Sequence, residues 1–267
     1  MSEEIKAESK AESKAENKAE NKAGNKAAVV FEHVSKAFGP KQVLRDVSFE
    51  VPAGQALCIL GRSGTGKSVT LKLLISLLKP DQGKIWVDRE EVTRMKEAEL
   101  SKVRRKMGFL FQDAALFDSL TLYENLALPL QRLTNKTLEE IDATVDKVLG
   151  QVGLGNDKKK MPGALSGGMR KRAGLARALV LEPKILLADE PSSGLDRITA
   201  SEIDELLIQQ KTEHQTTVIV VTHDVHGARR VGDRFAVFDK GDLVAFGTAA
   251  EVEQSENETA RKLISEY

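Results

Sequence analysis

The chain has 267 residues, of which 30% are charged, and its 40 Lys and Arg residues are balanced by 40 Asp and Glu residues. This balance excludes a strongly basic nucleic-acid binder. The longest apolar stretches, such as residues 217–221, fall far short of the ~18 residues that a membrane-spanning helix needs, so we expect a soluble protein. One cysteine and four scattered histidines exclude an internal disulfide and a paired zinc site, and they favour a reducing, cytoplasmic compartment.

Residues 1–28 form a charge-balanced segment of low complexity. From Lys6 the sequence repeats every four residues, first as Lys-Ala-Glu-Ser and then as Lys-Ala-Glu-Asn. A helix would place Lys next to Lys and Glu next to Glu at i,i+4, where like charges repel. The segment also has no apolar face. It therefore predicts a disordered tail, with a partner-binding helix as the alternative.

Two kinds of apolar pattern follow, and together they predict an α/β fold. Apolar and polar residues alternate in three segments, which predicts an antiparallel sheet: 29–34, 43–51 and 83–87. Continuous apolar runs, typical of strands that are buried on both faces of a parallel sheet, occupy four more: 56–60, 108–111, 185–188 and 217–221. Helical apolar spacing lies between these strands, at 67–78, 138–152, 167–181 and 198–210.

The most specific motif follows the predicted strand 56–60 and opens the predicted helix 67–78. It reads Gly-Arg-Ser-Gly-Thr-Gly-Lys-Ser, which is the P-loop pattern in its required strand–loop–helix setting. The glycines let the backbone curl so that its N–H groups and the helix N-terminus face an anion. Lys67 is expected to reach the β- and γ-phosphates of a nucleotide, and Ser68 to bind Mg²⁺. The expected nucleotide contacts are Gly61, Arg62, Ser63, Gly64, Thr65, Gly66, Lys67, Ser68 and Val69.

The apolar strand 185–188 ends in two carboxylates, Asp189 and Glu190. Many strands end in an acidic turn, so the pair alone is weak evidence. Beside a P-loop, Asp189 becomes a candidate Mg²⁺ ligand at the carboxyl edge of the sheet. Glu190 is then the candidate base for a water molecule that attacks the γ-phosphate.

A third motif, Leu-Ser-Gly-Gly-Met at residues 165–169, begins a helix. Its first turn combines a Ser166 cap with exposed backbone donors at Gly167 and Gly168, which predicts either a second anion site or a cap without a ligand. With this motif in place, the chain resembles the nucleotide-binding domain of ABC transporters. In that family the signature motif of one subunit closes over ATP held by the P-loop of the other.

The resemblance extends over residues 29–248 and implies roles for four further side chains. It implies that Phe38 stacks on adenine and that Gln112 is the Q-loop glutamine, which contacts Mg²⁺ and the reacting water. It also implies that Asp196 belongs to the D-loop and that His223 is the switch histidine. From the residues alone, simpler explanations remain open: Phe38 in the core, Gln112 as a surface amide, Asp196 as a helix cap, and His223 as a satisfied loop histidine.

The family resemblance also implies a domain plan. It places a RecA-like P-loop core and an antiparallel β subdomain within residues 29–250, a helical subdomain over about 113–165, and a C-terminal extension at 251–267. It implies a homodimer that holds two ATP molecules and drives a separate integral membrane permease at the inner face of the cell membrane. The apolar segment 114–130 either packs the helical subdomain or forms a groove for a permease helix.

Two departures from the usual family pattern refine the expectation. Met169 replaces the Gln that normally ends the signature, and Val69 replaces a P-loop Thr. With the segment 108–130, they resemble the ATPases of Mla/Mce-type lipid transporters, which implies a phospholipid cargo and possible further regulatory or lipid-binding subunits. The rivals are a soluble clamp on ribosomes or DNA and a regulatory subunit without turnover. The first is disfavoured by the single cassette and the zero net charge, and the second by the presence of Glu190 and His223.

Overall fold

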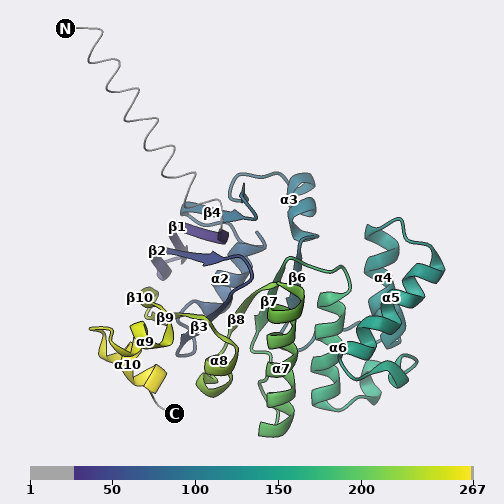
Figure 1. Cartoon of the computed structure of the whole chain (residues 1–267). Helices are drawn as coiled ribbons and strands as arrows, with labels where there is room; N and C mark the ends of the chain where they lie inside the picture. The colour runs from purple at the N-terminus through teal and green to yellow at the C-terminus, as the bar shows by residue number, and fades with distance from the viewer. Residues whose placement is uncertain (1–26, 266–267) are drawn as a thin grey trace, which may run out of the picture.

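The computed structural model describes residues 27–265 as two β-sheets with helices packed around them (Figure 1). Residues 1–26 of the predicted tail, together with residues 266 and 267, lie outside the described residues. The first strand already begins at Ala27, so the last two residues assigned to the tail belong to the folded domain instead.

The smaller sheet is antiparallel, in the strand order β2-β1-β4-β5. Its strands are β1 (Ala27–Phe38), β2 (Lys41–Pro52), β4 (Gln82–Val87) and β5 (Glu90–Glu91). The three alternating segments of the sequence coincide with β1, β2 and β4. The apolar side chains point into the core, where the rings of Phe31 and Phe49 stack with centroids 4.6 Å apart.

The larger sheet has six strands in the order β10-β9-β3-β8-β7-β6. All are parallel except β10, which pairs antiparallel with β9 at one edge. The strands are β3 (Ala56–Gly61), β6 (Met107–Leu110), β7 (Ile185–Asp189), β8 (Thr217–Val221), β9 (Arg234–Asp239) and β10 (Asp242–Gly247). The four continuous apolar runs are β3, β6, β7 and β8, so the predicted parallel sheet is confirmed.

The parallel sheet divides the core into two layers because neighbouring residues of a strand face opposite sides. Cys58 and Leu60 of β3 pack with the helices of one side, whereas Leu57 and Ile59 pack with the other. The first layer contains α4 (Leu122–Leu133), α5 (Leu138–Gln151), α6 (Gly167–Leu179), α7 (Arg197–His214) and α8 (Val225–Val231). The second contains α2 (Lys67–Leu74), α3 (Glu97–Arg104) and the antiparallel sheet.

The predicted helical subdomain and the predicted C-terminal extension both consist of helices in the structure. Residues 113–165 contain α4, α5 and two short 3₁₀ turns, and Figure 1 shows α4 and α5 at one side, away from the antiparallel sheet. The C-terminal residues form α9 (Ala249–Glu253) and α10 (Glu258–Ser265), whose Val252, Ala260 and Ile264 are buried in the first core layer. They are therefore an integral part of the domain. Within residues 27–265, no helix combines the length and hydrophobicity that a bilayer crossing requires.

Candidate active site

The P-loop lies between the end of β3 at Gly61 and the start of α2 at Lys67. Gly66 immediately precedes α2 with φ at 103°, and a Cβ there would lie 2.8 Å from the carbonyl oxygen of Val43. Only glycine fits this left-handed, crowded position. Gly66 also supplies no side-chain cap, so the first N–H groups of α2 face the loop interior as donors for an anion.

Lys67 is almost fully buried and turns its ammonium into the loop. Its Nζ donates hydrogen bonds to the carbonyls of Gly61 at 2.7 Å and Arg62 at 3.0 Å. Burial lowers the pKa of Lys67, although the nearby carboxylates of Glu190 and Asp189 act in the opposite direction. A phosphate anion within the loop would offset the cost of burying this positive charge.

Ser68 and Asp189, the two side chains expected to bind Mg²⁺, meet beside the P-loop. The Ser68 hydroxyl donates to Asp189 Oδ1 at 3.0 Å. Burial raises the pKa of Asp189, the hydrogen bond from Ser68 lowers it, and the neighbouring Glu190 raises it further. A divalent cation at this position would stabilise the ionised carboxylate.

Glu190 is connected to the loop that follows β8. His223 Nδ1 lies 2.8 Å from Glu190 Oε2, and the same oxygen accepts longer hydrogen bonds from the Thr222 hydroxyl and the His223 backbone N–H. The backbone of Glu190 has φ at +49°, a left-handed conformation that is rare for a non-glycine residue. Such backbone strain is concentrated at functional sites, where surrounding contacts maintain it.

Lys67, Ser68, Glu190 and His223 line one cleft of about 740 Å³, which we call the P-loop cleft. Ten predicted site residues reach it: Phe38, Ser63, Gly64, Gly66, Lys67, Ser68, Val69, Gln112, Glu190 and His223. Lys41 and Val43, which the sequence analysis missed, complete the wall near Phe38. Phe38 is 47% exposed, so its alternative placement in the core was wrong. Gln112 is exposed on the cleft wall.

The signature and D-loop residues lie elsewhere in the same chain. Ser166 caps α6, its hydroxyl oxygen accepting the Met169 N–H at 3.3 Å. Asp196 caps α7 by accepting the N–H groups of Ile198 and Thr199. Neither residue is among those that line the P-loop cleft in the described part of the chain. Within one chain, both therefore have the capping role that the sequence left open.

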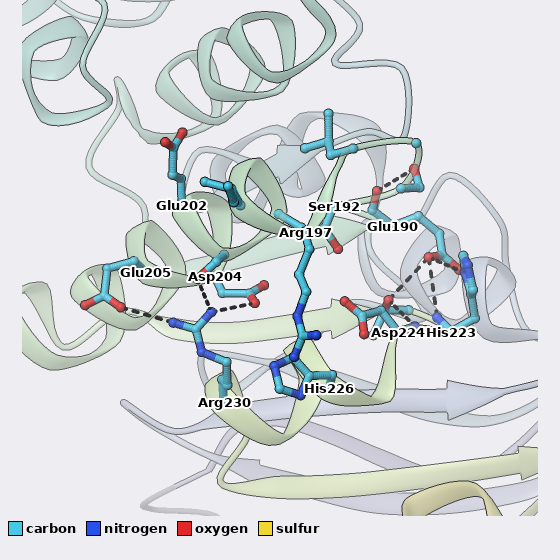
Figure 2. A pocket seen from close by; sticks show the side chains of 17 residues that line it. Glu190, Ser192, Arg197, Glu202, Asp204, Glu205, His223, Asp224, His226 and Arg230 are labelled. Atoms are coloured by element: carbon cyan, nitrogen blue, oxygen red, sulfur yellow. Dashed lines mark hydrogen bonds and ion pairs between the residues drawn. The ribbon is translucent and has the colours of Figure 1, made fainter. Parts of the chain in front are cut away.

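A second cavity of about 1000 Å³ adjoins Glu190 and His223 between the D-loop, α7 and α8 (Figure 2). Figure 2 shows Glu190 and His223 at one end of this cavity, with Arg197 extending into its middle. At the other end, Arg230 contacts Asp204 at 3.2 Å and Glu205 at 3.5 Å. We call it the α7–α8 cavity.

The geometry agrees with comparisons to known proteins. A family described as "ABC transporter" matches residues 44–193, which is more than half of the chain. The chain belongs to the ABC transporter family. Its activity is that of the ABC transporter ATPases, in which ATP hydrolysis is coupled to transport.

Two relatives and two solved structures illustrate the similarity. The probable ribonucleotide transport ATP-binding protein mkl of Mycobacterium leprae (strain TN) is 43% identical over 89% of this chain and 69% of its own length. The methionine import ATP-binding protein MetN of Escherichia coli O157:H7 is 40% identical over 79% of this chain and 61% of its own. The chain thus spans about two thirds of the length of these relatives.

Among solved structures, a dimeric ATP-binding cassette bound to ADP and Pi in a post-hydrolysis state has a TM-score of 0.77 and 34% identity. The match covers 82% of the present chain and 98% of the cassette in that structure. The cbiO1 protein of Clostridium perfringens, part of the ABC transporter complex cbiONQ, has a TM-score of 0.79 and 30% identity. This match covers 89% of the present chain and 94% of cbiO1. Both structures confirm the predicted fold.

Proposed function

We propose that the P-loop cleft of this ABC ATPase hydrolyses ATP with Glu190 as the general base. The observation that carries this proposal is the convergence of Lys67, Ser68, Glu190 and His223 on one cleft. Phe38 and Lys41, which also line the cleft, offer a ring to the adenine and a cation to the phosphates. Gly61, Arg62 and Thr65 complete the loop around the triphosphate.

The reaction requires little covalent chemistry from the protein. A water oxygen attacks the γ-phosphorus, the bond from that phosphorus to the bridging oxygen breaks, and ADP leaves with phosphate as the second product. Glu190 accepts a proton from the attacking water, and His223, 2.8 Å away, orients the carboxylate. Lys67 stabilises negative charge on the phosphates, and Gln112 positions the water from the cleft wall.

The residues beside the P-loop suit a Mg²⁺ ion, which this family uses with ATP. The Ser68 hydroxyl and the Asp189 carboxylate form a hard oxygen pair 3.0 Å apart, with the Gln112 amide in the same cleft. Within residues 27–265, no group of three or more His, Cys, Asp and Glu side chains forms a metal site by itself. Ser68 and Asp189 would hold the ion together with phosphate and water oxygens, and the ion would neutralise charge on the transferred phosphoryl group.

We also propose that two copies complete each site. Ser166, Gly167 and Gly168 would contact the γ-phosphate held by the partner chain, and Asp196 would lie at the interface. Two facts support this arrangement: these residues lie outside their own P-loop cleft, and a similar cassette is a dimer with ADP and Pi. The N-terminus of α6 would then supply backbone donors to an anion from the second chain.

A membrane permease is the proposed partner, with this chain bound to the inner face of the membrane. Of the two alternatives for residues 114–130, packing in the helical subdomain holds for Leu122, which is buried in the core. Leu116 is only half-buried, and Phe111 and Phe117 remain 36% and 50% exposed. We call these three side chains the docking patch, and their exposed apolar surface would suit a permease helix. The transport names of the relatives favour a permease over ribosomes or DNA.

Phospholipid is the proposed cargo, with further regulatory or lipid-binding subunits in the assembly. Its support is the resemblance of Met169, Val69 and the segment 108–130 to Mla/Mce-type ATPases. A ribonucleotide cargo is the second candidate, since a relative with 43% identity carries that name. The two cargoes differ in chemistry, so stimulation of a purified permease complex by phospholipid vesicles or by ribonucleotides distinguishes them.

The base role is tested with Glu190→Gln. Replacing the carboxylate by an amide should lower kcat by about 10²-fold or more, as loss of a general base does, while ATP binding persists. Lys67→Ala is the contrasting variant, because it removes a phosphate contact and should weaken ATP binding itself. Steady-state hydrolysis and equilibrium ATP binding separate the two effects. Near-normal turnover by Glu190→Gln would transfer the base role to another group, with His223 the next candidate.

The docking patch is tested with Phe117→Asp. A carboxylate within an apolar contact costs several kcal/mol, about 3 to 5 if unpaired, so co-purification with the permease should be lost. Leu138→Asp is the matched control, because Leu138 is 70% exposed on α5, outside the patch. Both variants should bind ATP normally. A Phe117→Asp variant that still co-purifies with the permease would place the docking surface elsewhere.

A further inference from the structure

Lys171 is a buried lysine on α6 that the sequence placed within a run of three basic residues. Its neighbour Arg170 is exposed, whereas Lys171 is only 7% exposed. Burial lowers the pKa of Lys171, with the carboxylates of Asp113, Glu190 and Asp189 acting against this effect. An ammonium in such a place is costly unless every N–H group has an acceptor.

The three N–H groups of Lys171 have three acceptors. Nζ donates to the carbonyl of Gln112, to the carbonyl of Glu190 at 2.9 Å and to the Ser193 hydroxyl at 3.2 Å. These acceptors belong to two loops at the carboxyl edge of the parallel sheet, one after β6 and one after β7. The ammonium therefore joins the Q-loop to the carboxylate-bearing loop through one atom.

The contact to Glu190 supports a strained backbone. With φ at +49°, Glu190 depends on its surroundings to keep its conformation. Its N–H donates to the carbonyl of Val221 at 2.8 Å, and its carbonyl accepts from Lys171 and from the Ser193 hydroxyl, both at 2.9 Å. Of these three hydrogen bonds, only the one from Lys171 has a charged donor. Hydrogen bonds from charged donors are stronger than those between neutral groups.

Helix α6 is also fixed to the Q-loop at two further points, so Lys171 has little freedom to move independently. A Cβ on Gly174 would lie 2.7 Å from the Cβ of Ala114, which shows how closely helix and loop approach. One turn further on, Arg177 donates to the carbonyl of Ala115. A displacement of the Q-loop would therefore be transmitted to the ammonium of Lys171.

We propose that Lys171 is a positioning residue for ATP hydrolysis, which aligns the Glu190 backbone with the Q-loop. The inference rests on the proposed base role of Glu190. Lys171 does not line the P-loop cleft, so it acts through Glu190 and Gln112 rather than on the nucleotide. It also gives the Q-loop, next to the proposed permease patch, a direct connection to the base.

The test compares Lys171→Met, which keeps the side-chain length but removes the ammonium, with Lys171→Arg, which keeps charged donors. Lys171→Met should lower kcat about tenfold or more and change the Kd for ATP less than about threefold, because only the alignment of the base is lost. Lys171→Arg should recover part of kcat. If Lys171→Met fails to fold, Ser193→Ala takes its place as a milder change. It removes one acceptor of the Lys171 ammonium and should lower kcat by a few-fold.

Lys211→Met is the matched control. Lys211 on α7 is also largely buried, and its Nζ donates to the carbonyl of Val231 and to Asp233, both at 3.0 Å. None of these residues lines the P-loop cleft. Lys211→Met should therefore lower the melting temperature without changing kcat. An equal loss of kcat in both lysine variants would mean that Lys171 acts only through overall stability, and it would overturn the inference.

Glu190→Gln, measured alongside, separates this inference from the proposed base role. If Glu190→Gln does not turn over and a folded Lys171→Met variant keeps normal kcat, the positioning role is wrong and the base role stands. If Glu190→Gln turns over normally, the base role is wrong, and the inference for Lys171 is withdrawn with it.

Discussion

Asp204, in the α7–α8 cavity, is a carboxylate that folding buries. It is 5% exposed, and burial raises its pKa to about 6, although the guanidinium of Arg230 at 3.2 Å acts against the shift. Because the folded-state pKa lies above the ordinary value of 3.8, the folded protein binds the extra proton between these two pH values. The tighter proton binding at Asp204 therefore stabilises the folded state fully below pH 3.8, the ordinary pKa. This stabilisation is lost as the pH rises through the folded-state pKa of about 6.

Asp204→Asn removes this titration. The melting temperature of the wild type, relative to that of the variant, should therefore fall from about pH 4 to about pH 7. Scanning calorimetry of both proteins across this range is the measurement. A difference in melting temperature that stays constant with pH would contradict the burial-driven shift, whatever its size.

Local sequence anticipated some site residues far better than others. Lys67 was predictable because glycines at fixed spacing before a helix define its surroundings within eight residues. His223 gained a role only through family resemblance, since its contact with Glu190 joins residues 33 positions apart. Lys171 was missed as a functional residue because a run of three basic side chains normally indicates a solvated face, and only tertiary packing buries the middle one.

At the scale of elements, glycine packing offers a direct test of how α6 lies against β6. A Cβ on Gly108 of β6 would lie 2.2 Å from the carbonyl oxygen of Ala178 on α6. Gly108→Ala should therefore force the two elements apart and lower the free energy of unfolding by about 1 to 3 kcal/mol. Urea denaturation provides the measurement.

Gly150→Ala is the control for this change. Gly150 lies in α5, and apart from the nearby backbone of its own helix no atom lies within 4 Å of a Cβ placed there. Alanine should raise the free energy of unfolding by about 0.5 to 1 kcal/mol through helix propensity alone. If both alanine variants were equally stable, the close approach of α6 and β6 would be wrong.

The elements themselves were predictable where the apolar pattern is long or continuous. The buried runs became β3, β7 and β8 almost residue for residue, because a strand covered on both faces needs no polar positions. In contrast, α8 has only seven residues, and β9 has only four apolar residues between Arg234 and Asp239, so both patterns are short. Helix α4 contains Pro129, but its capping box of Thr121 and Glu124 would have revealed its start.

At the scale of the whole molecule, the motifs fall into two separate groups. P-loop residues and Glu190 share one cleft, and Asp189 is bonded to Ser68 beside it, whereas Ser166 and Asp196 are positioned outside it. No local pattern predicts this separation, because it depends on how α6 and α7 pack against the parallel sheet. In the proposed dimer, a second copy would bring a signature motif to each P-loop cleft.

The most direct test of this account is the mass of Glu190→Gln in solution, measured by light scattering after size-exclusion chromatography with and without ATP and Mg²⁺. A composite site predicts the mass of one chain, 29.2 kDa, without nucleotide and twice that mass with ATP, because slow hydrolysis preserves the closed pair. Adding Ser166→Arg should return the mass to one chain while ATP stays bound. A Glu190→Gln protein that binds ATP and still has the mass of one chain would contradict the composite site.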